Sequence, residues 1–253
     1  MTAPVETYVY GIARADSPPA VDAGGVGPLQ APVRVLTGGS LAALVSDVPP
    51  GPLRAERDDL RRHMDVLQRA VATATVVPLR FGTIMPGDEA VREELLEARR
   101  PALERLLDEL DGHVEVTLKG TYAEAVLADI VRERPAIAEL RERVAQVSEA
   151  ASYYDRIRLG ELVSQAIAVR RDRDTAAILE RLEPLAADVR QGALTHERGA
   201  LSLAFLVARD RLGEFDDAAA AVAHDYDGTI AFRYTGPHAP FSFVRFDEEP
   251  AWG

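Results

Sequence analysis

The strand pattern, in which apolar and polar residues alternate with a period of two, is repeated in the first half of the sequence. It covers residues 5–13, 33–36, 41–48 and 113–119. Two adjacent glycines within residues 37–40 favour a hairpin turn between the second and third of these strands. In the fourth, Val114, Val116 and Leu118 share one face and polar residues share the other. These patterns predict sheet at both ends of the first half.

A helical pattern, with apolar residues three and four positions apart, fills most of the remaining sequence. It covers residues 56–74, 88–99, 101–110 and, with prolines as breaks, 121–190. The first of these helices has an apolar face that contains Leu60, Met64 and Leu67, and we expect His63 to lie on the same face.

Residues 76–86 are predicted to form one short buried strand that ends in a tight turn. Phe81 belongs to the apolar run, and Gly82 allows the backbone to turn where a side chain would clash. Arg80 is the exception, because a buried guanidinium without a partner costs several kcal/mol. We therefore expect a carboxylate or backbone carbonyls to hold Arg80.

The second half of the chain contains the order strand, helices, strand, strand, helix, strand, followed by one more strand. The predicted strands after the helices are residues 193–198, 201–209, 229–234 and 241–246. This order is that of a ferredoxin-like βαββαβ fold with a helical insertion. The sequence predicts an α+β protein with an N-terminal α+β domain at residues 1–111 and a C-terminal ferredoxin-like domain at residues 112–253. Residues 114–118 should pair with the C-terminal strands.

Composition excludes several classes of function. The 253 residues are 47% hydrophobic, carry a net charge of −12 and contain no cysteine. An acidic surface does not neutralise phosphates, so nucleic acid is not expected as a partner. Without cysteine there is no thiol catalysis or thiolate metal site. No apolar stretch is long enough for a membrane span, so we expect a cytoplasmic protein that has no membrane partner.

The sequence contains no recognisable catalytic motif. The five histidines form no spaced metal-binding pair, and the phosphate-binding and nucleophile motifs are absent, so we expect no catalytic residue, no metal and no cofactor. One candidate remains, because His63 and Arg80 lie on neighbouring predicted elements and could form a polar site. The favoured alternative is a core histidine bonded to backbone and an arginine paired with a carboxylate.

A second candidate is the segment 236–243 near the end of the chain. Its residues form either a rigid turn before an edge strand or an apolar docking surface presented by a fixed backbone. The residues concerned are Gly236, Pro237, Pro240, Phe241 and Phe243.

Taken together, these motifs resemble the GvpL/GvpF family of gas vesicle proteins. The resemblance rests on residues 8–12, His63, residues 77–83 and the segment 236–243, and it spans almost the full chain. The family pattern reads Gly-Pro-x-Pro-Pro-Tyr-Ser-Phe near its end, whereas Ala239 and Phe241 stand here. This chain therefore has no tyrosine hydroxyl at that position.

The resemblance implies a non-enzymatic accessory or minor structural protein of gas vesicle assembly, located in the cytoplasm and at the gas vesicle. Its implied partners are the apolar main shell protein and other gas vesicle accessory proteins. Two alternatives stay open. A small-ligand sensor of ferredoxin-like type would have a closed pocket between sheet and helices, whereas an enzyme would have titratable groups converging near His63 and Arg80.

Overall fold

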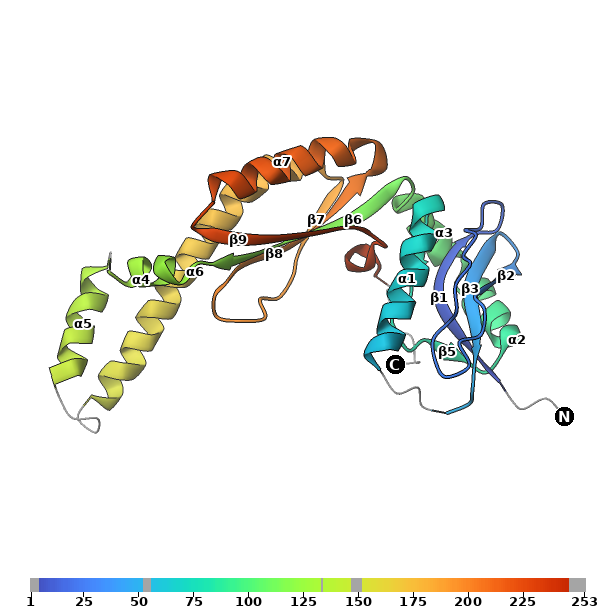
Figure 1. Ribbon diagram of the computed structural model, residues 1–253, viewed down its shortest axis with the longest axis horizontal. Helices are drawn as coiled ribbons and strands as arrows, with labels where there is room; N and C mark the ends of the chain where they lie inside the picture. Colours follow the sequence, from blue (N-terminus) through green and yellow to red (C-terminus); the bar gives the residue numbers. More distant parts are fainter. Residues whose placement is uncertain (1–4, 52–55, 133, 147–151, 246–253) are drawn as a thin grey trace. The chain divides into compact units, whose positions relative to one another are not determined.

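The computed structural model describes residues 5–51, 56–132, 134–146 and 152–245. Helix and strand alternate irregularly along the chain (Figure 1), so the protein is α+β, as predicted. The contacts divide the chain into two compact units. Unit 1 contains the residues up to Glu115 together with the segment that begins at Gly236, and unit 2 contains Val116–Thr235.

Unit 1 contains a five-stranded sheet in which β1 is central. The strand order is β2-β3-β1-β4, and β5 also pairs with β1. The strands are β1 (Glu6–Arg14), β2 (Arg34–Gly38), β3 (Leu41–Val48), β4 (Val77–Pro78) and β5 (Ile84–Met85). The predicted hairpin joins β2 to β3, and its turn residue Gly39 has a φ of +62°, which favours glycine.

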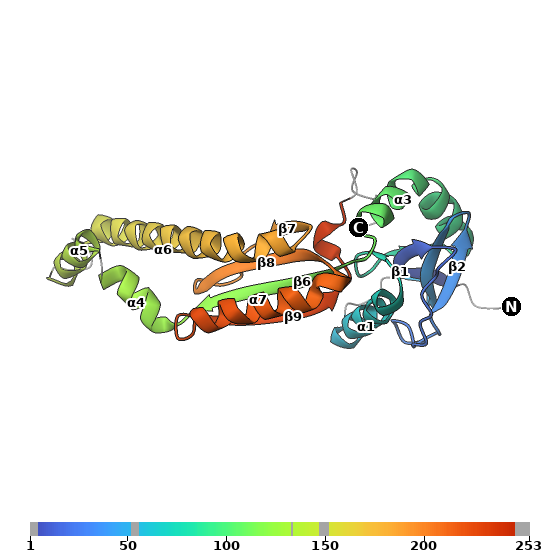
Figure 2. The same cartoon turned by 90° about the horizontal axis from the view of Figure 1, so that it is seen from above.

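Helices lie on both faces of this sheet (Figures 1 and 2). They are α1 (Arg57–Thr73), α2 (Asp88–Ala90), the π-helical segment η1 (Val91–Glu97) and α3 (Arg100–Glu109). Because α1 packs on one face and α3 on the other, β1 is buried along almost its whole length. This explains why the strand contains apolar and aromatic residues at consecutive positions.

Residues 76–86 do not form the single strand that we predicted. β4 and β5 have two residues each, and the backbone turns between them at Phe81 and Gly82, where Gly82 has a φ of +92°. The segment thus pairs with β1 twice, first beside Gly11 and Ile12 and then beside Thr7 and Tyr8. The turn separates two short strands, and each of them pairs with β1.

Unit 2 contains a four-stranded sheet with the order β7-β8-β6-β9. The strands are β6 (His113–Tyr122), β7 (Asp188–Gln191), β8 (Gly199–Ala208) and β9 (Ile230–His238). The prediction that residues 114–118 pair with later strands is confirmed. The strand expected at residues 193–198 is wrong, because the partner of β8 is the earlier segment β7, in the register Asp188↔Leu206.

The remaining elements of unit 2 are helical. They are α4 (Glu124–Arg132), α5 (Pro135–Gln146), α6 (Tyr153–Leu182), η2 (Glu183–Leu185), η3 (Arg209–Arg211) and α7 (Leu212–Asp225). One sheet face is covered by α7 and by the carboxyl-terminal part of α6, with Phe205 and Phe215 in contact at the centre of the core. The first part of α6 packs instead on α4 and α5, around Ile137 and Ala166.

The end of the chain differs from the prediction in two ways. The strand expected at residues 241–246 is wrong over residues 241–245, because η4 (Phe241–Phe243) is a short 3-10 helix, and residue 246 lies outside the described residues. Local hydrogen bonds from Phe241 N to Ala239 O and from Phe243 N to Pro240 O form tight turns there. The segment from Gly236 also groups with unit 1 and not with the predicted domain 112–253, because Ala239 is buried in the core of unit 1.

Candidate functional site

Two tyrosines of β1 place hydroxyl groups in the core of unit 1. The Tyr8 hydroxyl lies 2.9 Å from His63 Nδ1 and accepts a hydrogen bond from Gly82 N at 3.0 Å. The Tyr10 hydroxyl lies 2.8 Å from the Ser46 hydroxyl and accepts from Val26 N at 2.9 Å. Burial raises the pKa of both tyrosines above their ordinary value, so both hydroxyls stay protonated.

His63 lies at the centre of this cluster, and only 1% of its surface is exposed. Burial lowers its pKa to about 4, although the backbone of Leu79 opposes the shift. The imidazole is therefore neutral at physiological pH. Its Nδ1 is engaged by Tyr8, whereas Nε2 has no hydrogen-bond partner among the described residues. The favoured interpretation, a buried core histidine, fits the structure. A tyrosine hydroxyl satisfies Nδ1, and the backbone of Leu79 also interacts with the ring.

Four aromatic rings surround the imidazole. Tyr10 stacks on His63 with a centroid distance of 5.7 Å, and Tyr8 and Phe81 meet it edge-on at 5.8 and 5.7 Å. Phe241 approaches it at 6.2 Å. Phe81 and Phe241 are half-buried, so they join the core cluster to the surface. We call Tyr8, Tyr10, His63, Phe81 and Phe241 the aromatic cluster.

Side chains of unit 1 hold the segment around Phe241 in place. Gln68 Nε2 donates to the Pro237 carbonyl at 2.7 Å, and the backbone N and hydroxyl of Ser242 both donate to the Glu115 carboxylate at 2.8 Å. Phe243 is buried, as is Pro240, whereas Gly236 and Pro237 are exposed. Residues 239–243 are therefore fixed on unit 1 by side chains and by packing, whereas Gly236 and Pro237 belong to the end of β9.

Arg80 does not have the environment that we predicted. Its side chain is exposed, and within the described part of the chain it forms no ion pair. Its backbone carbonyl instead accepts hydrogen bonds from the amide and hydroxyl of Thr83 and so closes the turn that contains Gly82. The expectation of a buried, paired arginine is wrong, and so is that of a polar site that it shares with His63. The turn points its side chain outward from the sheet.

The structure thus brings together His63, Phe81, Gly82 and Phe241 from the predicted set, and it leaves Arg80 at the surface. The two tyrosine hydroxyls and Glu115 were not among the residues predicted from the sequence. A tyrosine at two alternate positions of a strand that is otherwise apolar was the available indication, because a buried tyrosine hydroxyl usually finds a partner. Nothing in the sequence indicated that Glu115 is buried, since it lies on the face of its strand that was expected to be exposed to solvent.

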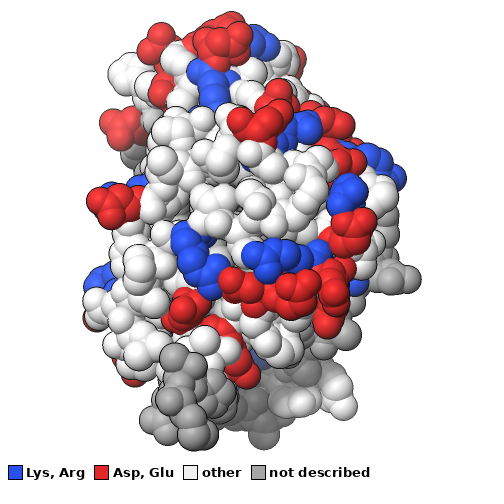
Figure 3. All heavy atoms as spheres, turned by 90° about the vertical axis from the view of Figure 1, so that its right-hand side faces the viewer, with Lys and Arg blue, Asp and Glu red and all other residues white. Residues whose placement is uncertain are grey.

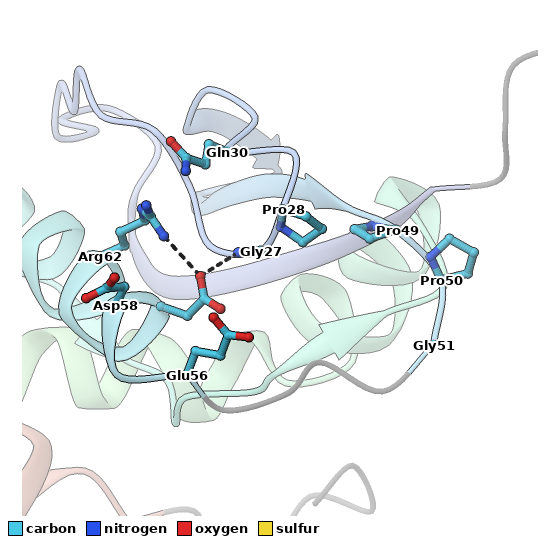
Figure 4. A pocket seen from close by; sticks show the side chains of 10 residues that line it. Gly27, Pro28, Gln30, Pro49, Pro50, Gly51, Glu56, Asp58 and Arg62 are labelled. Carbon is cyan, nitrogen blue, oxygen red and sulfur yellow. Dashed lines mark hydrogen bonds and ion pairs between the residues drawn. The ribbon is translucent and has the colours of Figure 1, made fainter.

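A pocket of about 480 Å³ lies elsewhere in unit 1, at the amino-terminal end of α1 (Figure 4). Pro28, Pro49 and Pro50 line one part of it, and Glu56 and Arg62 line another. None of the predicted site residues lines it. Within the described residues, no three His, Asp or Glu side chains are grouped so that they could hold a metal ion. None of the described helices is both long and apolar enough to span a membrane.

Known proteins resemble this chain along almost its full length. The family model for the gas vesicle synthesis protein GvpL/GvpF matches residues 6–245. Gas vesicle protein F of Streptomyces sp. strain CB03234 is 40% identical over 244 residues, which cover 95% of this chain and 100% of that protein. Gas vesicle protein F of Nostoc sp. strain PCC 7120 is 25% identical over 241 residues, or 94% of this chain and 97% of that protein.

Solved structures agree on the fold. The crystal structure of GvpF from Anabaena sp. PCC7120 matches with a TM-score of 0.83 at 24% identity and covers 96% of this chain and 100% of that chain. GvpF from Microcystis aeruginosa matches with a TM-score of 0.80 at 22% identity, over 95% of this chain and 99% of that chain. Sequence and fold together define a gas-vesicle-associated protein. The chain belongs to the GvpL/GvpF family.

Proposed function

We propose that this protein is a non-enzymatic accessory or minor structural component of gas vesicle assembly, and that it binds the apolar main shell protein. The observation that carries the proposal is family membership over residues 6–245. The motif residues that belong to this match converge in unit 1, where the aromatic cluster reaches the surface through Phe81 and Phe241.

The surface beside the aromatic cluster supports an apolar partner. On α1, Leu60 and Met64 are 48% and 37% exposed, one turn apart, and Met64 follows His63 directly. Gln68, one further turn along, is the residue that binds the Pro237 carbonyl. Single exposed apolar residues are common, but a pair one turn apart on the helix that holds His63 suits the docking of an apolar helix or strand. We call Leu60 and Met64 the α1 strip.

The charge distribution supports protein partners over nucleic acid. On the face of the molecule drawn in Figure 3, acidic and basic side chains are interspersed around a broad uncharged region, and no continuous basic surface is visible. Nucleic-acid binding depends on such a surface to neutralise phosphates. We therefore infer that the partners are the shell protein and other gas vesicle accessory proteins, and that the protein acts in the cytoplasm at the forming gas vesicle.

We further infer that the two units are separate domains and that unit 2 is ferredoxin-like with a helical insertion. Its sheet order β7-β8-β6-β9 supports this, because βαββαβ domains place their first and third strands at the centre and their second and fourth strands at the edges. The pocket at α1 belongs to unit 1, so it gives no support to a ligand sensor in the ferredoxin-like unit.

Co-expression with the shell protein tests the proposal. The wild-type protein should keep shell protein soluble and form a complex that survives moderate salt, because apolar contacts are screened little. The double variant Leu60→Ser/Met64→Ser should lose most of that effect. Leu29→Ser/Val35→Ser, at two other exposed apolar positions of unit 1, is the matched control and should behave as wild type.

Two outcomes would contradict different parts of the proposal. If the shell protein aggregates equally with and without the wild-type chain, and no complex is recovered at any salt concentration, shell-protein binding is wrong. If the complex forms but both double variants weaken it equally, binding stands and the α1 strip is not its surface.

A further inference from the structure

Two basic side chains lie opposite each other on neighbouring strands of unit 2. Ala123 N donates to Thr229 O at 2.9 Å, where β6 ends and β9 begins, and the two strands are neighbours in the sheet. Neighbouring strands that meet end to start run antiparallel. Counting four residues from this contact along each strand places Lys119 opposite Arg233, with Cβ atoms about 5 Å apart.

Both side chains project from the sheet face that α6 and α7 leave open. Leu118 belongs to the core beneath those helices, and Tyr234 stacks on Phe215 of α7. Since successive side chains of a strand point to opposite faces, Lys119 and Arg233 point away from the helices. Both are exposed.

No carboxylate neutralises this pair within the part of the chain that the structure describes. On the same face, Asp188 of β7 is bound by Arg190, and Glu115 is bound by Ser242. Like charges that lie directly opposite each other destabilise a sheet. The pair is notable because the chain has 41 acidic residues against 29 basic ones, so an uncompensated basic site stands out.

We propose that this open sheet face binds an acidic segment of a partner protein, with a carboxylate held between Lys119 and Arg233. Thr117, Thr121 and Thr235 share the face by the same alternation, and their hydroxyls can donate further hydrogen bonds to the bound carboxylates. Arginine and lysine at this spacing suit carboxylate oxygens, since hydrogen bonds between charged groups are the stronger ones.

This surface is separate from the α1 strip. Shell-protein binding as proposed rests on apolar side chains of unit 1, whereas the basic pair belongs to unit 2 and recognises charge. The two proposals therefore succeed or fail independently. The acidic composition of the chain disfavours nucleic acid as the occupant, because two basic residues neutralise few phosphates.

Binding of a synthetic poly-glutamate peptide to the full-length protein, measured by calorimetry at low salt, tests the inference without any shell protein. Lys119→Ala/Arg233→Ala should weaken binding about five- to tenfold, as expected for the loss of two exposed ion pairs. The control Arg158→Ala/Arg173→Ala removes the same charge from exposed positions of α6 and should change binding by less than about twofold. Raised salt should weaken the wild-type complex.

Thermal unfolding supplies a second readout. Lys119→Ala/Arg233→Ala should melt at the wild-type temperature or above it, because the substitutions remove a like-charge contact, so weaker binding is not a result of misfolding. Absence of wild-type binding, or equal loss in both double variants, would overturn the proposal. Tighter binding of a single-stranded oligonucleotide than of the peptide would overturn the assignment of an acidic protein segment.

Discussion

Replacing Tyr8 by phenylalanine would remove one oxygen atom from the core of unit 1 and leave the ring in place. That oxygen lies 2.9 Å from His63 Nδ1 and accepts a hydrogen bond from Gly82 N at 3.0 Å. Tyr8→Phe would remove the hydrogen bond to His63 Nδ1, and Nε2 of the same buried ring already lacks a partner among the described residues.

The expected cost follows from these environments. A buried polar group that loses its only partner costs about 1–3 kcal/mol. Loss of the Gly82 hydrogen bond adds little to this free-energy cost, because Gly82 is exposed and its N–H can donate to water instead. We therefore expect Tyr8→Phe to lower the free energy of unfolding of unit 1 by about 1–3 kcal/mol.

Hydrogen exchange measures this change in the unit concerned. A global melting curve would not distinguish the two compact units, whereas exchange is measured at individual amides. Amides of β1 and β3 report on unit 1, and amides of β8 report on unit 2 as an internal reference. The matched control is Tyr154→Phe, which removes a hydroxyl from a side chain that is 83% exposed.

The shared hydrogen bond couples the effects of substitutions at Tyr8 and His63. In a double-mutant cycle with His63→Phe, the second substitution should cost less when Tyr8→Phe is already present, because the hydrogen bond is lost only once. If the β1 amides of Tyr8→Phe exchange as slowly as those of wild type, the hydrogen bond does not stabilise the core as described. The same conclusion follows if the free-energy costs of the two substitutions are additive.

Two other predictions concern His63 and Arg80. The pKa of His63 is about 4 in the folded protein against 6.5 ordinarily, so its contribution to stability is complete above pH 6.5 and is lost as pH falls towards 4. The loss is about 3 kcal/mol in total. Urea unfolding across this pH range should show this loss in wild type and not in His63→Gln. Parallel plots of unfolding free energy against pH for the two proteins would refute the prediction. Arg80→Ala should change the unfolding free energy by less than about 0.5 kcal/mol, because its side chain is exposed. A loss of about 3–5 kcal/mol on urea unfolding would instead indicate a buried pair.

Local pattern was enough to predict the elements whose cause lies within a few residues. The strand at β1, the hairpin turn at Gly39 and the helix α1 all follow from hydrophobic period and turn chemistry. Their sum predicts the α+β class, and the return of β6 to pair with later strands was predicted from the element order. β7 was missed, because residues 188–190 were assigned to the helical stretch 121–190 and only the pairing with β8 defines them as a strand.

Orientation was the property that the pattern of α1 did not determine. Leu60, Met64 and Leu67 share an apolar face in the sequence, yet Leu67 is buried, while Leu60 and Met64 stand partly in solvent. His63 and Asp59 are buried instead, since the Tyr8 hydroxyl binds the first and Gly27 N and Arg62 bind the second. The buried side of α1 thus includes polar residues whose hydrogen-bond partners lie in distant segments, and the apolar spacing alone does not identify that side.

The sequence by itself determined most of the helices and strands, among them β1, α1 and β6, because those preferences depend on neighbours along the chain. Only the tertiary structure decided the surroundings of His63 and Arg80, the turn at Gly82 and the short helix at Phe241. Tyr8 and His63 are 55 positions apart in sequence, and Ser242 and Glu115 are 127 apart. Such contacts depend on how the completed sheet and helices pack, and burial then sets the protonation of His63 and leaves the Arg80 side chain in solvent.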